Sequence, residues 1–315
     1  MYDLIIIGGG PAGSAAAVYA GAKALVKIPS KCFATAKLKE RAGNPDKLGV
    51  YLDRNALGML VENGTRPWAL ATPLHYELHF GFDVARTSHG GLMGAAVVDG
   101  ATGSAISFGY EEIDAAERIP TKSIRSFVRE QLELYFQTHG RLPASILFQR
   151  DGRLLDTEIK GIRAAMQRVS KEHPECASPA WAAVVIEKTT SAPLRLFLKQ
   201  GHQVERPLSG TYLLQHTQAG YVILAGAPTL KQGSPRPIRV ELIDASSDAV
   251  PEIVPILQDI FWLSRLNWNS PDIDIRLPIT LRFTDQKLER YALEAVTDDD
   301  DGDWEEEEEE GEPEE

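Results

Sequence analysis

The sequence predicts an α/β fold in which helices flank a mixed β-sheet. Two observations indicate this class, the alternation of two kinds of segment and the order in which they occur. From His75 onward, short segments rich in β-branched and aromatic residues alternate with segments whose apolar residues recur at helical spacing. The expected elements follow the order hairpin, helix, strand, helix and, after several short strands, a late strand and helix. This order differs from the regular strand–helix repetition of a doubly wound sheet.

The first part of this pattern predicts three strands and a helix. A strand over residues 76–87 comes before a hairpin over residues 91–110, whose turn at Asp99-Gly100 is a dipeptide typical of tight turns. Residues 119–140 predict an amphipathic helix that ends at Gly140. Its apolar face consists of Ile124, Phe127, Val128, Leu132 and Phe136.

The later part of the pattern is less regular. A strand over residues 144–152 precedes a helix over residues 156–173, for which Asp156 is the expected N-cap. A strand over residues 275–283 and a helix from about Thr284 are expected to complete the body. Short strands are expected at residues 182–190, 194–198, 211–217, 220–226 and 238–244, and helices near residues 53–61 and 250–266.

The N-terminal stretch "MYDLIIIGGGPAG" has a different character. A run of three isoleucines precedes Gly8, Gly10 and Gly13, a G-x-G-x-x-G pattern typical of a turn that holds a pyrophosphate at a helix N-terminus. Residues 1–21 resemble the FAD-binding N-terminus of thioredoxin reductase. A dinucleotide fold also needs an acid about 20 residues later to hold the ribose, but the first acid after Asp3 is Glu40. We therefore expect a truncated strand–turn–helix segment.

The charge of the chain is unevenly distributed. The net charge is −12, but residues 298–315 contain 14 acids and no Lys or Arg, so residues 1–297 carry +2. Such an acidic run is expected to be a disordered tail, and the body remains compatible with a nucleic-acid partner. There is no apolar run of about 18 residues for a membrane span, and two distant cysteines without a CxxC motif fit a cytoplasmic protein.

Four acids are the candidates for chemistry. Asp83 lies between two apolar residues of a predicted strand, where an unpaired carboxylate is costly to bury. Asp151 and Asp285 each follow a predicted strand, and Glu117 precedes a helix. Each acid also has an ordinary structural explanation. Asp83 could be a strand-end carboxylate, and Asp151 could belong to an Asp-Gly turn. Asp285 could lie in the first turn of a helix, and Glu117 in a solvated loop.

Together the four acids suggest a metal-dependent reaction. Carboxylates that converge on one point repel each other unless divalent cations neutralise them. Hard oxygen ligands suit Mg²⁺ or Mn²⁺. Two such ions, about 4 Å apart, can clamp the attacking and leaving oxygens of a phosphodiester. If the acids converge, the sequence therefore predicts a nuclease.

The segments that carry these acids resemble the PIWI domain of prokaryotic Argonautes, which has a ribonuclease H-like fold. "GFDVART" is similar to the strand of the first catalytic Asp. "AAERIPTKSIRSFVREQLELYFQTHGRLPASILFQRDG" is similar to the glutamate loop, the next helix and the strand of the second Asp. "RLPITLRFTDQKLERYA" resembles the last strand and helix. Asp83, Glu117 and Asp151 follow one another at intervals of 34 residues, as in cleaving bacterial members.

This resemblance covers about residues 27–295 and implies a domain organisation. The fold class is then α/β, a ribonuclease H-like mixed sheet flanked by helices, with a truncated α/β segment at the N-terminus. The expected parts are a Gly-rich segment (1–26), a remnant of the MID domain with its junction to PIWI (27–72), the PIWI domain (73–297) and the acidic tail (298–315).

The resemblance also implies a function. The family uses a short guide strand to find a complementary nucleic acid and cuts that target strand. Asp83, Glu117, Asp151 and Asp285 would form the catalytic tetrad, in which the three aspartates hold two Mg²⁺ or Mn²⁺ ions. Glu117 would complete the site when its loop swings in after guide–target pairing. The candidate nucleic-acid contacts are Lys31, Lys122, Arg125 and Arg150.

Two departures from the family keep other functions open. The resemblance does not extend to the N-terminal and PAZ domains or to most of the MID domain, so a separate chain is a possible source of these functions. The guide pocket usually has Gln where this chain has Lys31, and Lys where this chain has Glu62. A non-cleaving PIWI module that binds guide and target is therefore one alternative. An FAD- or NAD-dependent reductase of the thioredoxin reductase type is the other.

Overall fold

The computed structural model describes residues 35–62, 66–87, 90–114, 118–188, 194–227, 234–246, 251–268 and 275–298. The strands are β1 (Leu78–Thr87), β2 (Gly90–Asp99), β3 (Ala105–Ile113), β4 (Ser145–Asp151), β5 (Ala180–Glu187), β6 (Leu198–Gln200), β7 (Gln203–Glu205), β8 (Tyr212–His216), β9 (Ala219–Val222) and β10 (Ile238–Ala245). The helices are α2 (Thr35–Ala42), α3 (Pro45–Glu62), α4 (Thr121–His139), α5 (Asp156–Glu172), α6 (Ile253–Ser264) and α7 (Ile279–Asp298).

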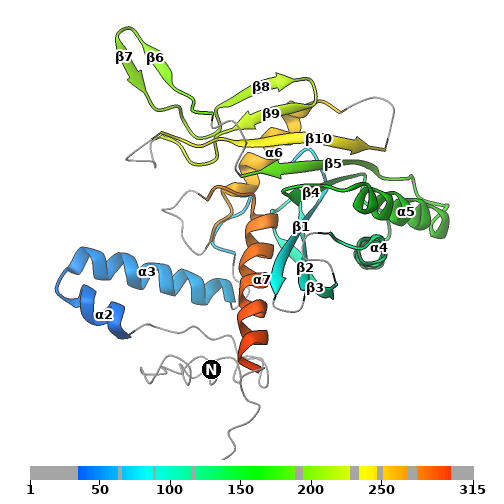
Figure 1. The fold of residues 1–315 in the computed structure, drawn as a ribbon, viewed down its shortest axis with the longest axis horizontal. Helices are drawn as coiled ribbons and strands as arrows, with labels where there is room; N and C mark the ends of the chain where they lie inside the picture. Colours follow the sequence, from blue (N-terminus) through cyan, green and yellow to red (C-terminus); the bar gives the residue numbers. More distant parts are fainter. Residues whose placement is uncertain are drawn as a thin grey trace, which may run out of the picture.

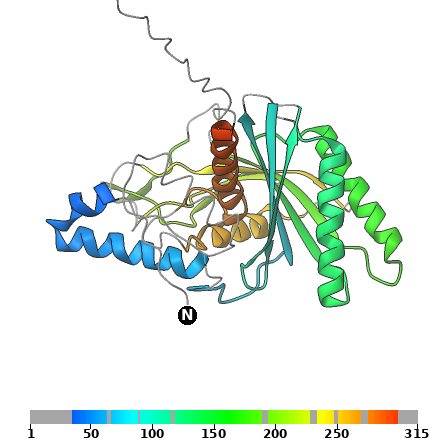
Figure 2. The same cartoon turned by 90° about the horizontal axis from the view of Figure 1, so that it is seen from below.

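A mixed sheet forms the centre of the molecule (Figure 1). Within the described ranges it has eight strands in the order β3-β2-β1-β4-β5-β10-β9-β8, and β6 and β7 pair as a separate ribbon. Strands β1, β4 and β5 run parallel, and their neighbours on both sides are antiparallel. Helices α4 and α5 cover one face, and α6 and α7 the other (Figure 2). The predicted mixed sheet flanked by helices is confirmed.

The predicted hairpin and first long helix are both present. The hairpin joins β2 to β3, and the Asp99 carboxylate accepts hydrogen bonds from the backbone N–H groups of Ala101 and Thr102 at 3.2 and 3.1 Å. Helix α4 ends at Gly140, which adopts a left-handed conformation with φ 67° and donates its N–H to the Phe136 carbonyl. The apolar face of α4 packs on the sheet as expected. Ile124, Val128 and Leu132 are fully buried, and Phe127 and Phe136 are partly buried.

Three predictions at element boundaries are wrong. Residues 275–283 do not form a strand, because α7 begins at Ile279. Pro278 cannot donate a ladder hydrogen bond, and its carbonyl instead accepts hydrogen bonds from Leu281 and Arg282 in the first turn of α7. Residues 194–197 have no regular structure before the short strand β6. Helix α5 has Leu155 rather than Asp156 at its N-cap, so Asp156 is the first residue of the helix.

The N-terminal helices extend beyond the prediction for residues 53–61. Helix α3 begins at Pro45, because the Asn44 side chain accepts the Lys47 N–H at 3.1 Å and Pro suits the first helical position. The glycine-rich segment (residues 1–26) and the acidic tail after Asp298 lie outside the described residues. In the described part of the chain, no helix combines the length and hydropathy needed to cross a membrane.

Candidate catalytic edge

Two of the predicted acids meet where β1 and β4 end. These strands are parallel, and Phe82 is the register partner of Arg150, so Asp83 and Asp151 follow at the same level on adjacent strands. Phe82 is buried in the core under α4 and α5. Because side chains alternate along a strand, Asp83 and Asp151 face the opposite side of the sheet, which α7 covers. We call Asp83, Asp151, Asp285 and Lys188 the carboxylate edge.

Lys188 supplies a positive charge at this edge. It follows β5, and its Nζ lies 2.6 Å from Asp151 Oδ2. Burial disfavours the charged ammonium group, but the hydrogen bond and charge of Asp151, with further attraction from Asp285 and Asp83, raise the pKa of Lys188. The ammonium group therefore occupies a position where the acids favour a cation. Lys188 is not among the residues predicted from the sequence, in which its only signal is its place directly after a buried strand.

Asp83 is the most perturbed acid of the edge. Burial and, secondarily, repulsion from Asp151 raise the pKa of Asp83 from 3.8 to about 6. The Val84 N–H, which donates to Asp83 Oδ1 at 2.8 Å, and the charges of Arg150 and Lys188 act in the opposite direction. Two carboxylates crowded in a half-buried site favour the binding of a further cation.

Arg150 lies beneath the edge and does not face solvent. Its side chain is 6% exposed, with Nη1 3.6 Å from Asp83 Oδ1 and Nε 3.6 Å from Glu158 Oε1. Nη1 also donates to the Asp151 carbonyl at 2.6 Å. The expectation that Arg150 contacts a nucleic-acid phosphate is therefore corrected. Arg150 points to the face of the sheet that α5 covers, whereas Asp83 and Asp151 point to the face that α7 covers. Its guanidinium is therefore buried under α5.

Glu158 links this buried charge to the start of two helices. Its carboxylate is fully buried and accepts the Leu155 N–H at 2.9 Å and the Ile119 N–H at 3.1 Å. Ile119 comes two residues after Glu117, which lies outside the described residues. Glu158 thus fixes the segment that follows the predicted catalytic glutamate. A Glu in the third position of a helix was the available sequence signal.

Helix α7 carries Asp285 against the sheet because two glycines leave room for it. A Cβ on Gly81 would lie 2.7 Å from Thr280 Cβ, and one on Gly94 would lie 2.8 Å from Thr284 Cγ2. Thr280 also donates a hydrogen bond to Gln149 Oε1 of β4 at 2.7 Å. Asp285 is therefore held in the second turn of α7, where it does not directly follow a strand as predicted.

A cavity of about 440 Å³ lies beside Asp285. It is lined by Lys188, Ile275, Arg276, Leu277, Arg282 and Asp285. Arg282 Nη1 is 3.4 Å from Asp285 Oδ2. Burial, together with repulsion from Arg236 and Arg195, lowers the pKa of Arg276. Several guanidinium groups therefore gather beside the carboxylate edge, an arrangement that favours an anion.

The acids are only partly assembled into a metal site. Asp83 and Asp151 provide hard oxygen donors at the same level of the sheet, and Asp285 is close enough to Lys188 to stabilise its charge. Among the described residues, however, no three His, Cys, Asp or Glu side chains are close enough together to hold a metal ion. The donor set suits Mg²⁺ or Mn²⁺ in chemistry, while Lys188 supplies the neighbouring positive charge in this structure.

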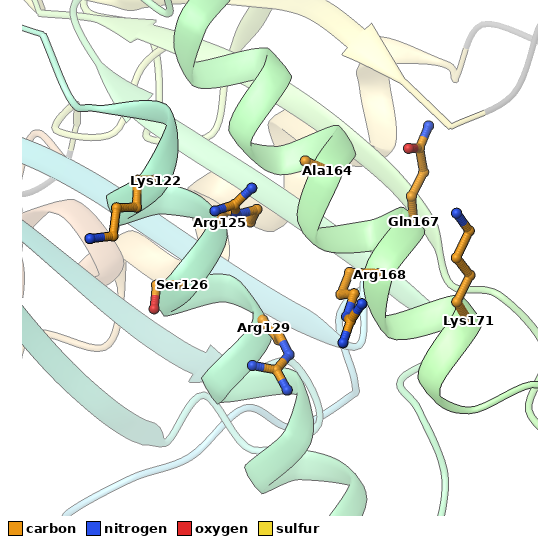
Figure 3. A pocket seen from close by; sticks show the side chains of 8 residues that line it. All are labelled: Lys122, Arg125, Ser126, Arg129, Ala164, Gln167, Arg168 and Lys171. Carbon is orange, nitrogen blue, oxygen red and sulfur yellow. The ribbon is translucent and has the colours of Figure 1, made fainter.

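The remaining predicted contacts lie elsewhere. Lys122 and Arg125 are exposed on α4, where they line a groove between α4 and α5 (Figure 3). Lys31 lies outside the described residues. Glu62 is the last residue of α3.

Comparison with known proteins supports the ribonuclease H-like fold, a mixed sheet flanked by helices. The family model described as Piwi domain matches residues 18–292. The protein argonaute of Thermus thermophilus is 28% identical over 234 residues, which are 73% of this chain and 31% of the relative. The structure of Clostridium butyricum Argonaute bound to a guide DNA and a 19-mer target DNA matches with a TM-score of 0.69 and 21% identity. That match covers 86% of this chain and 34% of the other. The chain thus spans about a third of the length of each protein.

Proposed function

Because this chain belongs to the Piwi domain family, we propose that it binds a guide strand paired with a target strand and cleaves the target at the carboxylate edge. The observation that carries the proposal is the register of β1 and β4, which sets Asp83 and Asp151 side by side at their strand ends. Two rigid neighbouring strands hold the carboxylates at a fixed separation, as phosphodiester cleavage requires.

The charge balance of the edge suits a divalent cation. Asp83 and Asp151 repel each other, and this repulsion contributes to the raised pKa of Asp83. We assign Asp83, Asp151 and Asp285 as the residues that would hold Mg²⁺ or Mn²⁺, with Glu117 as a fourth carboxylate. When bound, such ions supply Lewis-acid activation of water and neutralise charge at a phosphodiester.

Two cationic side chains have different roles in this proposal. Arg150, buried between Asp83 and Glu158, orients the Asp83 carboxylate from the α5 side of the sheet. Lys188 neutralises Asp151 in the absence of a divalent ion and must move away, or share the carboxylate, when an ion binds. Both roles follow from charge pairing in a partly buried site, where such interactions are stronger than in water.

The cavity beside Asp285 is suited to the nucleic-acid backbone. Arg276 and Arg282 line it, and Arg195 and Arg236 are close enough to Arg276 to repel its charge. A phosphate placed among these guanidiniums would relieve their repulsion and could accept bidentate hydrogen bonds. We propose that these arginines position the scissile strand without reading its sequence. Guide anchoring would depend on other residues, in this polypeptide or in a separate one.

A test compares binding and cleavage in the full chain. A short 5′-phosphorylated DNA guide, annealed to a labelled complementary DNA strand, is incubated with Mn²⁺ and the wild type, Asp83→Asn or Asp151→Asn. We expect each substitution to slow cleavage by about 10³-fold or more, since several kcal/mol of charge stabilisation is lost. Binding of the duplex should persist. Asp46→Asn, which changes an exposed acid of α3, is the matched control and should cleave like the wild type. Equal cleavage by Asp151→Asn would contradict the proposal.

A non-cleaving module that binds guide and target is the second candidate. The ion pair between Lys188 and Asp151 favours it, because it neutralises one of the two central carboxylates without a metal ion. The same experiment separates the two candidates. Duplex binding by the wild type without Mn²⁺- or Mg²⁺-dependent cleavage would support the binding module alone.

A further inference from the structure

A basic groove runs between α4 and α5, on the side of the sheet opposite α7. It has a volume of about 470 Å³, and Figure 3 shows cationic side chains from both helices around it. The groove is separate from the cavity beside Asp285. It is lined by Lys122, Arg125, Ser126 and Arg129 of α4 and by Ala164, Gln167, Arg168 and Lys171 of α5. We call it the α4–α5 groove.

The lining residues form two matched stripes. On each helix they recur at positions i, i+3, i+4 and i+7, which is the spacing of one helical face. The helices run side by side in the same direction: Thr121 Oγ1 donates to the Thr157 carbonyl at 2.7 Å near their starts, and Arg129 meets Glu172 further along. Gly161 permits this approach, because a Cβ there would lie 2.9 Å from the Thr121 carbonyl oxygen. Each stripe is about 10 Å long.

The positive charge of the groove is only partly compensated. Glu172 binds both Arg129, at 2.9 Å, and Arg168, at 2.6 Å, so one carboxylate holds two guanidinium groups in place. Lys122, Arg125 and Lys171 form no ion pair with any other described residue. These three side chains are exposed, so their charged groups are in water and can contact a polyanion.

The acids near the groove have other partners. Glu130 Oε1 accepts a hydrogen bond from Ser126 at 3.1 Å. Glu133 lies 2.8 Å from His173 and also accepts a hydrogen bond from Gln137. Neither glutamate lines the groove. The lining contains five cations and no acid, so its positive charge exceeds the negative charge of the acids beside it, which are Glu172 and, through their charges on Arg129, Glu133 and Glu130.

We propose that the α4–α5 groove binds the phosphodiester backbone of a single-stranded nucleic acid that extends beyond the guide–target duplex. This inference rests on the proposed function, which supplies the nucleic acid that the groove would bind. Both helices begin near the carboxylate edge, since α5 starts five residues after Asp151 and the first residue of α4, Thr121, donates a hydrogen bond to the Thr157 carbonyl at the start of α5. A strand that leaves the edge can therefore enter the groove at the helix N-termini.

The lining favours backbone contacts over base recognition. It contains no aromatic side chain on which a base could stack, whereas lysine, arginine, serine and glutamine all donate hydrogen bonds to phosphate oxygens. The site is thus expected to bind without sequence preference.

The test measures the binding of a labelled 20-nucleotide DNA strand of arbitrary sequence to the full chain, by fluorescence anisotropy in EDTA. The groove variant carries Lys122→Ala, Arg125→Ala and Lys171→Ala. The control variant carries Lys39→Ala, Lys47→Ala and Lys199→Ala, which removes the same charge from exposed positions outside α4 and α5. We expect the groove variant to raise Kd about tenfold over the control and to reduce the slope of log K against log salt by about 2.

Several outcomes would overturn the inference. Equal Kd values and salt slopes for the two variants would show that only net charge matters. If the wild type did not bind the DNA strand, a nucleic acid would be excluded as the ligand of the groove. Tighter binding of a 20-residue polyglutamate peptide, lost in the groove variant, would make the groove a site for acidic peptides instead. Thermal melts verify folding, and Lys122→Glu alone should weaken DNA binding in the same direction. Because EDTA prevents cleavage, these results are independent of the nuclease proposal, which Asp83→Asn and Asp151→Asn test.

Discussion

The carboxylate edge and the α4–α5 groove both carry charge, but they hold it in different ways. At the edge, Asp83 and Asp151 are partly buried at strand ends, with Arg150, Glu158 and Lys188 close by. In the groove, the cations sit on exposed helical faces and Glu172 pairs with only two of them. The edge faces the side of the sheet that α7 covers, and the groove lies between the two helices of the other side.

This difference shows which charges the fold depends on. A buried charge must be paired, so removing one partner leaves the other uncompensated and destabilises the protein. An exposed cation is solvated with or without a partner, so removing it changes binding but hardly changes stability. The edge should therefore be sensitive in folding assays, and the groove should be sensitive only in binding assays.

The largest effect on stability is expected for Glu158→Ala. This change removes the acceptor of two backbone N–H groups and the carboxylate next to Arg150. The free energy of unfolding, measured with urea, should fall by about 3–5 kcal/mol. The matched control is Asp156→Ala on the same helix, where an exposed first-turn acid should cost about 0.5 kcal/mol. Similar losses for both variants would mean that the buried pair of Arg150 and Glu158 contributes no more to stability than a surface charge.

A smaller loss is expected for Gly81→Ala, which tests how α7 reaches the edge. The added methyl would lie 2.7 Å from Thr280 Cβ and 2.8 Å from the Thr280 carbonyl carbon, and backbone atoms cannot move aside as a side chain can. Unfolding free energy should fall by about 1–3 kcal/mol, and displacement of Asp285 should also slow cleavage. Gly49→Ala, at an open position of α3, should instead be neutral or stabilising. An unchanged melting temperature for Gly81→Ala would refute the close packing of α7.

Lys188→Gln should change the edge without unfolding it. The substitution keeps a polar side chain but removes the ammonium group that competes with a divalent ion for Asp151. Calorimetric titration with Mn²⁺ should show an affinity about tenfold higher than in the wild type, because one like charge has been removed from the site. Lys199→Gln, on exposed β6, is the control and should bind Mn²⁺ like the wild type. Unchanged affinity for Lys188→Gln would mean that Lys188 and the metal ion do not share Asp151.

The weakest of these effects is expected at the opposite ends of the same strands. Hydrogen bonding from Arg141 lowers the pKa of Glu77 to about 2 against the effect of burial, and Tyr135 and the Ala144 N–H act in the same direction as Arg141. Since the folded pKa lies below the unfolded one, this stability is present above about pH 4.5 and is lost as the pH falls toward 2.

Glu77→Gln should therefore reduce unfolding free energy at neutral pH by on the order of 1 kcal/mol, since the cluster is partly screened by solvent. Its stability should also vary less than that of the wild type between pH 4.5 and 2. The measurement is chemical denaturation at a series of pH values, with the substitution Glu112→Gln at an exposed residue of β3 as control. If the unfolding free energy of Glu77→Gln fell between pH 4.5 and 2 as steeply as that of the wild type, other carboxylates would be the origin of this pH dependence.

Much of the architecture followed from local sequence patterns. The strand β1, the turn at Asp99 and the apolar face of α4 were predictable because residue type, turn residues and helical periodicity are local properties. The segment "IRLPITLRF" was misread because its alternation resembles a strand. The segment instead leads into α7, whose buried residues Thr280, Leu281, Thr284 and Leu288 follow the spacing of a helix that packs on the sheet.

The residue types of the candidate site could be recognised from the chain alone, since Asp83 and Asp151 could be selected from their places in or after predicted strands. Which charges share the edge depends on the three-dimensional fold. The parallel register of β1 and β4 sets the two acids side by side, buries Arg150 beneath them and brings Lys188 to Asp151. Register, crossover and the packing of α7 on Gly81 and Gly94 depend on contacts between distant segments, and no local pattern encodes those contacts.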